Sequence, residues 1–146
     1  MNNREELKVL YLEDDQDSIE LVTFTLGLDQ IHVTPVSTCE KALELAMGRK
    51  FDLYLLDGLL DSGYSFELCR RLREFDPDAP VVFYTALGFP QDIKDGVSAG
   101  ADAYLVKPFA GDLAETLRST ARDKRKRAAT RVLVGQPRQI DSTARL

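Results

Sequence analysis

Short apolar runs recur along the chain, and each of them stops at polar residues. Most of the runs hold four or five residues rich in Leu, Val, Tyr and Phe, which is typical of strands buried on both faces of a parallel sheet. Between the runs, apolar residues recur at helical spacing. We predict five strands, at residues 9–12, 31–36, 51–56, 80–84 and 103–106.

A helix is predicted after each strand, with residues 57–63 forming a loop before the third helix. The fourth helix, at residues 91–99, has the weakest pattern. Local signals predict where the helices begin and end. The first helix would be capped by Asp15 or Asp17 and the second by Ser37 or Thr38. The second helix would end at Gly48 and the third at Asp76-Pro77, and the last would begin after Pro108 and run through Ala121.

This alternation of strand and helix predicts an α/β fold. A parallel connection needs a covering segment, so the strands form a parallel sheet with right-handed crossovers and helices on both faces. A length of 146 residues, 44% of them hydrophobic, suits a single domain. Cys39 and Cys69 fall in helical patterns without metal-ligand spacing and are expected to be small buried residues, and His32 is expected to be a strand residue without a catalytic role.

Polar residues follow four of the predicted strands. Glu13, Asp14 and Asp15 come after VLYL, Asp57 after LYLL, Thr85 after VVFY and Lys107 after AYLV. The carboxyl ends of parallel strands line one edge of an open sheet, so these side chains are expected to converge there. Together they predict a functional site.

The acidic residues of this site favour a divalent cation. Like charges held close together raise each other's pKa unless a cation neutralises them. Glu13 and Asp14, with Asp57 from the third strand and a main-chain carbonyl, offer oxygen ligands of the kind that Mg²⁺ prefers. Asp15 and Asp17 are equally well explained as solvated acids at a helix N-terminus.

Asp57 is the candidate nucleophile. A carboxylate beside a metal ion and a lysine can attack phosphorus and form an acyl phosphate. Lys107 would place an ammonium on the phosphoryl oxygens, and Thr85 offers a hydroxyl at the end of the fourth strand. The sequence therefore predicts phosphoryl transfer to Asp57.

Over residues 6–123 the chain resembles the receiver domain of bacterial two-component response regulators. The pieces that carry the resemblance are VLYLEDD, DLYLLD, VVFYTA and GADAYLVKPF, of which the last is the most specific. The resemblance implies a flavodoxin-like, doubly wound, five-stranded parallel sheet with the site at the switch point between the first and third strands.

The resemblance also implies a role for each site residue. Asp57 would be the phosphoacceptor, Thr85 and Lys107 would contact the phosphoryl group, and Tyr104 would be an aromatic switch that turns inward behind Thr85. The implied cofactor is Mg²⁺, and its implied ligands are Glu13, Asp14, Asp57 and the backbone carbonyl of Leu59. The donor would be a phosphohistidine on a histidine kinase or phosphotransfer protein, and the protein would catalyse only its own phosphoryl transfer.

Two departures from the family pattern lie near the site. Asp61 stands where many receivers have Pro, and its charge would either tighten metal binding or oppose phosphoryl entry. Leu59 and Leu87 put apolar groups where water would approach an acyl phosphate. We therefore expect slow spontaneous dephosphorylation.

Two other functions remain open at this stage. A receiver-like module could bind partners without phosphorylation, with Asp61 as its signature. A phosphohydrolase of the haloacid-dehalogenase type needs a second Asp two residues after the nucleophile, and Leu59 occupies that position. The hydrolase is therefore the weaker alternative.

Charge divides the chain into an acidic body and a basic tail. Residues 1–117 hold 10 Lys and Arg against 22 Asp and Glu, whereas residues 118–146 hold 9 against 2. The acidic body disfavours nucleic-acid binding through the domain itself. We predict a receiver domain at residues 1–123 and a basic tail or linker remnant at residues 124–146, without a separate output domain. Residues 131–134 are strand-like in composition.

The remaining expectations concern partners and location. No apolar run approaches the roughly 20 residues that span a bilayer, and no signal peptide is apparent, so we expect a cytoplasmic protein. By resemblance, a downstream protein target would bind the face formed by the fourth helix, fifth strand and fifth helix. A homodimer through the same face is a further possibility.

Overall fold

The computed structural model describes the backbone of residues 5–134 and the side chains of residues 5–124. Five parallel strands form one sheet in the order β2-β1-β3-β6-β7. This is the flavodoxin-like order, so the predicted fold class is confirmed. The strands of this sheet are β1 (Leu7–Leu12), β2 (Ile31–Val36), β3 (Leu53–Leu56), β6 (Val81–Thr85) and β7 (Ala103–Val106).

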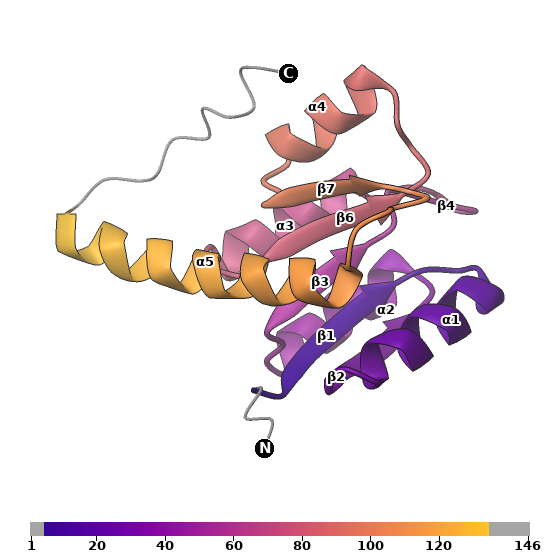
Figure 1. Ribbon diagram of the computed structural model, residues 1–146. Coiled ribbons are helices and arrows are strands. Elements are labelled where there is room, and N and C mark those ends of the chain that lie inside the picture. Colours follow the sequence, from indigo (N-terminus) through magenta and orange to yellow (C-terminus); the bar gives the residue numbers. More distant parts are fainter. Residues whose placement is uncertain (1–4, 135–146) are drawn as a thin grey trace.

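Helices cover both faces of the sheet. They are α1 (Gln16–Gly27), α2 (Cys39–Gly48), α3 (Phe66–Phe75), α4 (Pro90–Ser98) and α5 (Leu113–Val134). Figure 1 shows α1 and α5 in front of the sheet and α2 and α3 behind it, and two clusters of buried apolar side chains fill the two layers between helices and sheet. The central strands β1 and β3 are buried almost completely, as their unbroken apolar runs predict.

Local capping explains where the first helices begin. The Asp15 carboxylate accepts a hydrogen bond from the Ser18 N–H at 3.0 Å, and the Thr38 hydroxyl accepts one from the Lys41 N–H at 3.1 Å. Asp15 and Thr38 are therefore the caps. Asp15 is fully exposed, and its hydrogen bonds with Ser18 lower its pKa, which fits the alternative of a solvated helix N-terminus.

The segment predicted as a loop at residues 57–63 contains a small hairpin, so that prediction was wrong in part. Strands β4 (Leu59–Leu60) and β5 (Gly63–Tyr64) pair in antiparallel fashion. Gly63 adopts a φ of 129°, which favours glycine. Strands of two residues leave no periodicity for a sequence pattern to show.

The last helix also differs from the prediction. It begins at Leu113 because the Asp112 carboxylate accepts a hydrogen bond from the Glu115 N–H, and it continues to Val134. The backbone of residues 131–134 is therefore helical and not strand-like. Lys, Arg and Ala dominate residues 121–129 and are strong helix formers, which favours this continuation.

The two cysteines are free, and Cys69 is buried whereas Cys39 is half-buried. His32 lies exposed on β2, as expected. Within the part of the chain that the structure describes, no helix combines the length and the apolar character needed to cross a membrane.

Candidate functional site

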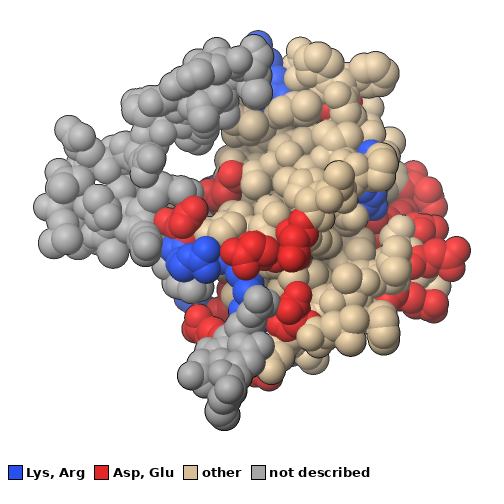
Figure 2. Space-filling view, in the orientation of Figure 1, with Lys and Arg blue, Asp and Glu red and all other residues tan. Residues whose placement is uncertain are grey.

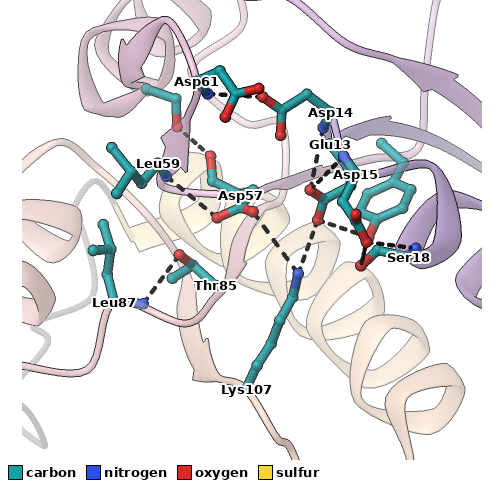
Figure 3. A network of polar contacts seen from close by, with 12 residues as sticks. Glu13, Asp14, Asp15, Ser18, Asp57, Leu59, Asp61, Thr85, Leu87 and Lys107 are labelled. Atoms are coloured by element: carbon teal, nitrogen blue, oxygen red, sulfur yellow. Dashed lines mark hydrogen bonds and ion pairs between the residues drawn. The ribbon is translucent and has the colours of Figure 1, made fainter.

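Strand register brings the predicted site residues together. Leu12 of β1 lies opposite Leu56 of β3, so Glu13 and Asp57 leave the sheet side by side. Thr85 pairs with Val106 of β7, and the N–H of Lys107 donates to the Thr85 carbonyl at 2.8 Å. Figure 3 shows the resulting cluster at the carboxyl edge of the sheet.

Glu13 is the most buried carboxylate of the cluster, with 2% of its surface exposed. Its Oε2 accepts hydrogen bonds from the N–H groups of Asp14 and Asp15, both at 3.1 Å. Its Oε1 accepts from Lys107 Nζ at 2.8 Å and from the Tyr11 hydroxyl at 3.3 Å. Both oxygens of Glu13 are thus engaged within the protein.

Lys107 lies between two carboxylates. Its Nζ is 2.8 Å from Glu13 Oε1 and 3.8 Å from Asp57 Oδ2. The ammonium also lies 5.0 Å from the ring centroid of Tyr84, within the range of a cation–π contact. These contacts from β1, β3 and β6 hold the ammonium at the edge of the site.

Asp57 is only 8% exposed, and its Oδ1 accepts a hydrogen bond from the Leu59 N–H at 3.2 Å. Burial raises the pKa of Asp57, because it removes the carboxylate from water, and the nearby charge of Glu13 acts in the same direction. The Thr85 hydroxyl, the Leu59 N–H and the Lys107 ammonium favour the carboxylate form and oppose that rise. A buried carboxylate with one cation nearby suits a nucleophile.

Thr85 is buried at the end of β6, where its hydroxyl oxygen accepts a hydrogen bond from the Leu87 N–H at 3.3 Å. Leu87 lies against the segment that follows Asp57, since a Cβ on Gly58 would be 3.2 Å from the Leu87 side chain. The Leu87 side chain therefore lies next to Gly58, the residue that follows Asp57, whereas Leu59 is 44% exposed.

Tyr104 reaches the site indirectly. Its half-buried ring packs 5.7 Å from Phe83 between centroids, and its hydroxyl donates to the Leu87 carbonyl at 2.7 Å. A Cβ on Gly96 of α4 would lie only 2.7 Å from the ring, so this glycine makes room for it. Leu87 thus contacts both Thr85 and Tyr104.

Asp14 joins the site from the turn after β1. Its Oδ2 accepts a hydrogen bond from the backbone N–H of Asp61, at the tip of the β4–β5 hairpin, at 2.7 Å. Figure 3 shows the carboxylates of Asp14 and Asp61 close together. Asp61 therefore contacts the site through its main chain. The sequence prediction considered only its side-chain charge.

Sequence reasoning missed three further residues. Tyr11 and Tyr84 contact Glu13 and Lys107, and the Ser65 hydroxyl donates to the Asp57 carbonyl. The first two carry a weak signal, since Tyr11 lies two residues before Glu13 on the same face of the chain and Tyr84 directly precedes Thr85. Ser65 carries no such signal, because its contact depends on the hairpin.

The residues fit a Mg²⁺ ion that keeps part of its water shell. Within residues 5–124, no group of three or more His, Cys, Asp and Glu side chains is arranged to hold a metal ion. Mg²⁺, however, is usually held by one or two carboxylates, waters and a substrate phosphate. Asp14 and Asp57 each use one oxygen in a main-chain hydrogen bond, which leaves the other to face a cation.

The surface around the site is acidic. Figure 2 shows Asp and Glu side chains gathered on the right-hand side, where α1 begins beyond the carboxyl end of β1. Asp15 and Asp17, which follow β1 in the chain, are both exposed. An anionic ligand would therefore need cations at the site to offset this field.

Comparisons with known proteins agree with the architecture. A family model described as the response regulator receiver domain matches residues 9–118. The DNA-binding dual master transcriptional regulator RpaA of Synechocystis sp. is 38% identical over 104 residues, which cover 70% of this chain and 43% of that protein. The nisin biosynthesis regulatory protein NisR of Lactococcus lactis is 30% identical over 102 residues, covering 70% of this chain and 44% of that protein.

The chain thus spans less than half the length of these curated relatives. Among solved structures, a two-component response regulator from Clostridium difficile superposes with a TM-score of 0.71 at 27% identity, covering 84% of this chain and 98% of that chain. The resemblance noted in the sequence is therefore confirmed. The chain belongs to the response regulator receiver domains, which are signalling domains of two-component systems rather than classical enzymes.

Proposed function

We propose that this protein is a phosphorylation-dependent signalling receiver. In this proposal Asp57 accepts a phosphoryl group from a phosphohistidine of a histidine kinase or phosphotransfer protein, and the phosphorylated form changes its partner binding. The observation that carries the proposal is the position of Lys107 Nζ, 2.8 Å from Glu13 and 3.8 Å from the buried Asp57. An ammonium held there can contact the oxygens of a phosphoryl group on Asp57.

The transfer step needs the carboxylate form of Asp57. One carboxylate oxygen forms a bond to phosphorus while the bond between phosphorus and the donor's imidazole nitrogen breaks, and the imidazole keeps the electron pair. Lys107 and the Thr85 hydroxyl bind the phosphoryl oxygens. The buried position of Asp57 excludes much of the surrounding water.

We assign the cation site to Asp14, Asp57 and the main-chain carbonyl of Leu59. Bound Mg²⁺ would supply positive charge to the transferring phosphoryl oxygens. The sequence also implied Glu13 as a ligand. Because its oxygens already accept four hydrogen bonds, we propose that Glu13 contributes its charge to the cation site and not a direct contact. It holds Lys107 and the turn that carries Asp14.

Leu87 offers a route from phosphorylation to Tyr104. A phosphoryl group adds negative charge and strong acceptors, so the Thr85 hydroxyl can move toward it to donate to its oxygens, which would lengthen or break the hydrogen bond that the hydroxyl accepts from the Leu87 N–H. Movement of Leu87 would then disturb the hydrogen bond between its carbonyl and the Tyr104 hydroxyl. We propose that the face of α4, β7 and α5 responds, that a protein target binds there, and that a homodimer through this face is its alternative use.

The phosphodonor protein is proposed to dock on α1. Leu21 and Phe24 of this helix and Leu28, which caps its C-terminus, are between 67% and 72% exposed. These residues recur at intervals of three and four, as an apolar helix face does. Because α1 begins directly after Asp15, a helical partner on this face would carry its histidine to the edge of the site.

The rest of the proposal follows the sequence. We place a receiver domain at residues 1–123 and a basic tail or linker remnant at residues 124–146, expect a cytoplasmic location, and expect no nucleic-acid binding by the acidic body. The protein would catalyse only its own phosphoryl transfer.

Incubation with a small acyl phosphate donor and Mg²⁺, followed by intact mass spectrometry, tests the proposal. We expect a phosphate mass increment that disappears in Asp57→Asn and after chelation of the metal. Labelling that persists in Asp57→Asn would refute it.

A second function is favoured by the contact between Asp61 and Asp14, which already braces the site. It is a module that binds partners without phosphorylation. Absence of any adduct under conditions that label an ordinary receiver would support this module.

A further inference from the structure

The β4–β5 hairpin donates main-chain hydrogen bonds to two carboxylates of the site. The Leu59 N–H donates to Asp57 Oδ1 at 3.2 Å, and the Asp61 N–H donates to Asp14 Oδ2 at 2.7 Å. Leu59 and Asp61 are two residues apart on one strand and its turn, whereas Asp14 and Asp57 follow different strands of the main sheet. One short element thus connects the ends of β1 and β3.

The hairpin is itself well anchored at its base. The Ser65 N–H donates to the Gly58 carbonyl at 3.0 Å, and the buried Ser65 hydroxyl donates to the Asp57 carbonyl. The Tyr64 ring stacks on Phe66 at a centroid distance of 5.9 Å. A base held in this way fixes the position of the tip that carries the Asp61 N–H.

A hydrogen bond to one oxygen of a carboxylate orients the other. Bonds between an N–H and an ionised carboxylate are stronger than neutral ones. Partners that orient metal-binding side chains typically change metal affinity by about 10- to 100-fold when they are removed. Asp14 is only half-buried, so burial alone does not fix the orientation of its carboxylate.

We propose that the backbone N–H of Asp61 is a positioning group that holds Asp14 ready to bind a divalent cation. The main chain at residue 61 acts on Asp14, and the Asp61 carboxylate is secondary. The inference rests on the cation site of the proposed function and adds to it a role for the hairpin.

Two substitutions separate the main chain from the side chain. Asp61→Pro removes the N–H and the charge, whereas Asp61→Ala removes the charge alone. Gln30 is the only non-glycine residue with a positive φ within residues 5–134, so the backbone at Asp61 does not exclude proline by the sign of φ. Circular dichroism of the metal-free variants verifies that both are folded.

Isothermal titration with Mg²⁺ gives the affinity of each protein without any phosphodonor. We expect Asp61→Pro to bind Mg²⁺ about tenfold more weakly than the unmodified protein, with Asp61→Ala much closer to the unmodified protein. Equal losses in both variants, or unchanged or tighter binding by Asp61→Pro, would overturn the inference while leaving phosphorylation of Asp57 intact. Absence of Mg²⁺ binding by the unmodified protein would overturn both the inference and the proposed cation site.

Amide hydrogen exchange, followed by NMR, tests the same bond in the unmodified protein. The Asp61 amide is expected to exchange slowly both without Mg²⁺ and at saturating Mg²⁺, because the bond and the cation use different oxygens of Asp14. Fast exchange at saturating Mg²⁺ would mean that the hairpin competes with the cation, and it would overturn the inference.

Discussion

Lys107 is closer to Glu13 than to the proposed phosphoacceptor Asp57. The Nζ atom lies 2.8 Å from Glu13 Oε1 and 3.8 Å from Asp57 Oδ2. Glu13 therefore holds the ammonium in place before any phosphoryl group is present. A phosphoryl group on Asp57 would offer the same ammonium a second anionic partner without a long movement.

This pair predicts a loss of stability in Lys107→Ala. The substitution leaves the buried Glu13 carboxylate without its cation. Lys107 is itself 24% exposed, so we expect the free energy of unfolding to fall by about 2 kcal/mol, less than for a fully buried pair. Urea denaturation of Lys107→Ala and of the unmodified protein measures this change in the free energy of unfolding.

Lys41→Ala is the matched control for Lys107→Ala. It removes an exposed pair with Glu44, in which the charged atoms are 3.6 Å apart, and should change the free energy of unfolding by less than about 0.5 kcal/mol. Equal effects of the two substitutions would contradict the structural role given to Glu13.

The raised pKa of Asp57 predicts that Asp57→Asn stabilises the protein at neutral pH. The unfolded chain ionises near the ordinary value of 3.8, and the folded protein ionises at higher pH. The stability associated with the protonated form is therefore lost as pH rises through the folded pKa. Denaturation at several pH values should give Asp57→Asn a higher free energy of unfolding than the unmodified protein at pH 7, and this difference should disappear below pH 3.8. An Asp57→Asn variant that is less stable at pH 7 would contradict the raised pKa of Asp57.

Gly96→Ala tests the position of Tyr104. In an exposed helix interior this change usually stabilises by up to about 1 kcal/mol. Here the new Cβ would lie 2.7 Å from the Tyr104 ring, so we expect destabilisation and loss of the hydrogen bond from Tyr104 to Leu87. Thermal unfolding and the NMR signals of Leu87 measure both effects.

Gly27→Ala is the control for this prediction. Gly27 lies in α1 with no atom within 4 Å of an added Cβ, so Gly27→Ala should be neutral or stabilising. A stabilising Gly96→Ala would show that Tyr104 is not packed as described.

Leu59 and Leu87 predict a long-lived phosphorylated state. Neither side chain can bind or activate a water molecule, so hydrolysis of the acyl phosphate lacks a positioned nucleophile. Leu59→Asn and Leu87→Gln should each shorten the lifetime several-fold, as followed by mass spectrometry after removal of the donor. A lifetime of only seconds for the unmodified protein in Mg²⁺ buffer would contradict this.

The sheet and most of the site follow from the sequence for a physical reason. Strands buried on both faces must be apolar throughout, so the residues that end them, such as Asp57 and Thr85, stand out. Parallel order then brings those residues to one edge. The sequence does not predict which carboxylate binds Lys107, because residue spacing along the chain does not give the distances between side chains.

The hairpin was beyond sequence reasoning for a different reason. Its strands have two residues each, and its link to the site uses the main-chain N–H of Asp61. Side-chain chemistry gives no signal for a main-chain donor. The sequence predicted a role for the charge of Asp61, whereas in the structure it is the backbone N–H of Asp61 that contacts the site.

Identification of the phosphorylated residue tests the central claim most directly. After treatment with an acyl phosphate donor and Mg²⁺, borohydride reduction of the acyl phosphate and peptide mapping would locate the modified carboxylate. We predict modification at Asp57, with the neighbouring Asp14 and Asp61 untouched. Modification elsewhere, or none while the protein binds Mg²⁺, would contradict the assignment of Asp57 as the phosphoacceptor.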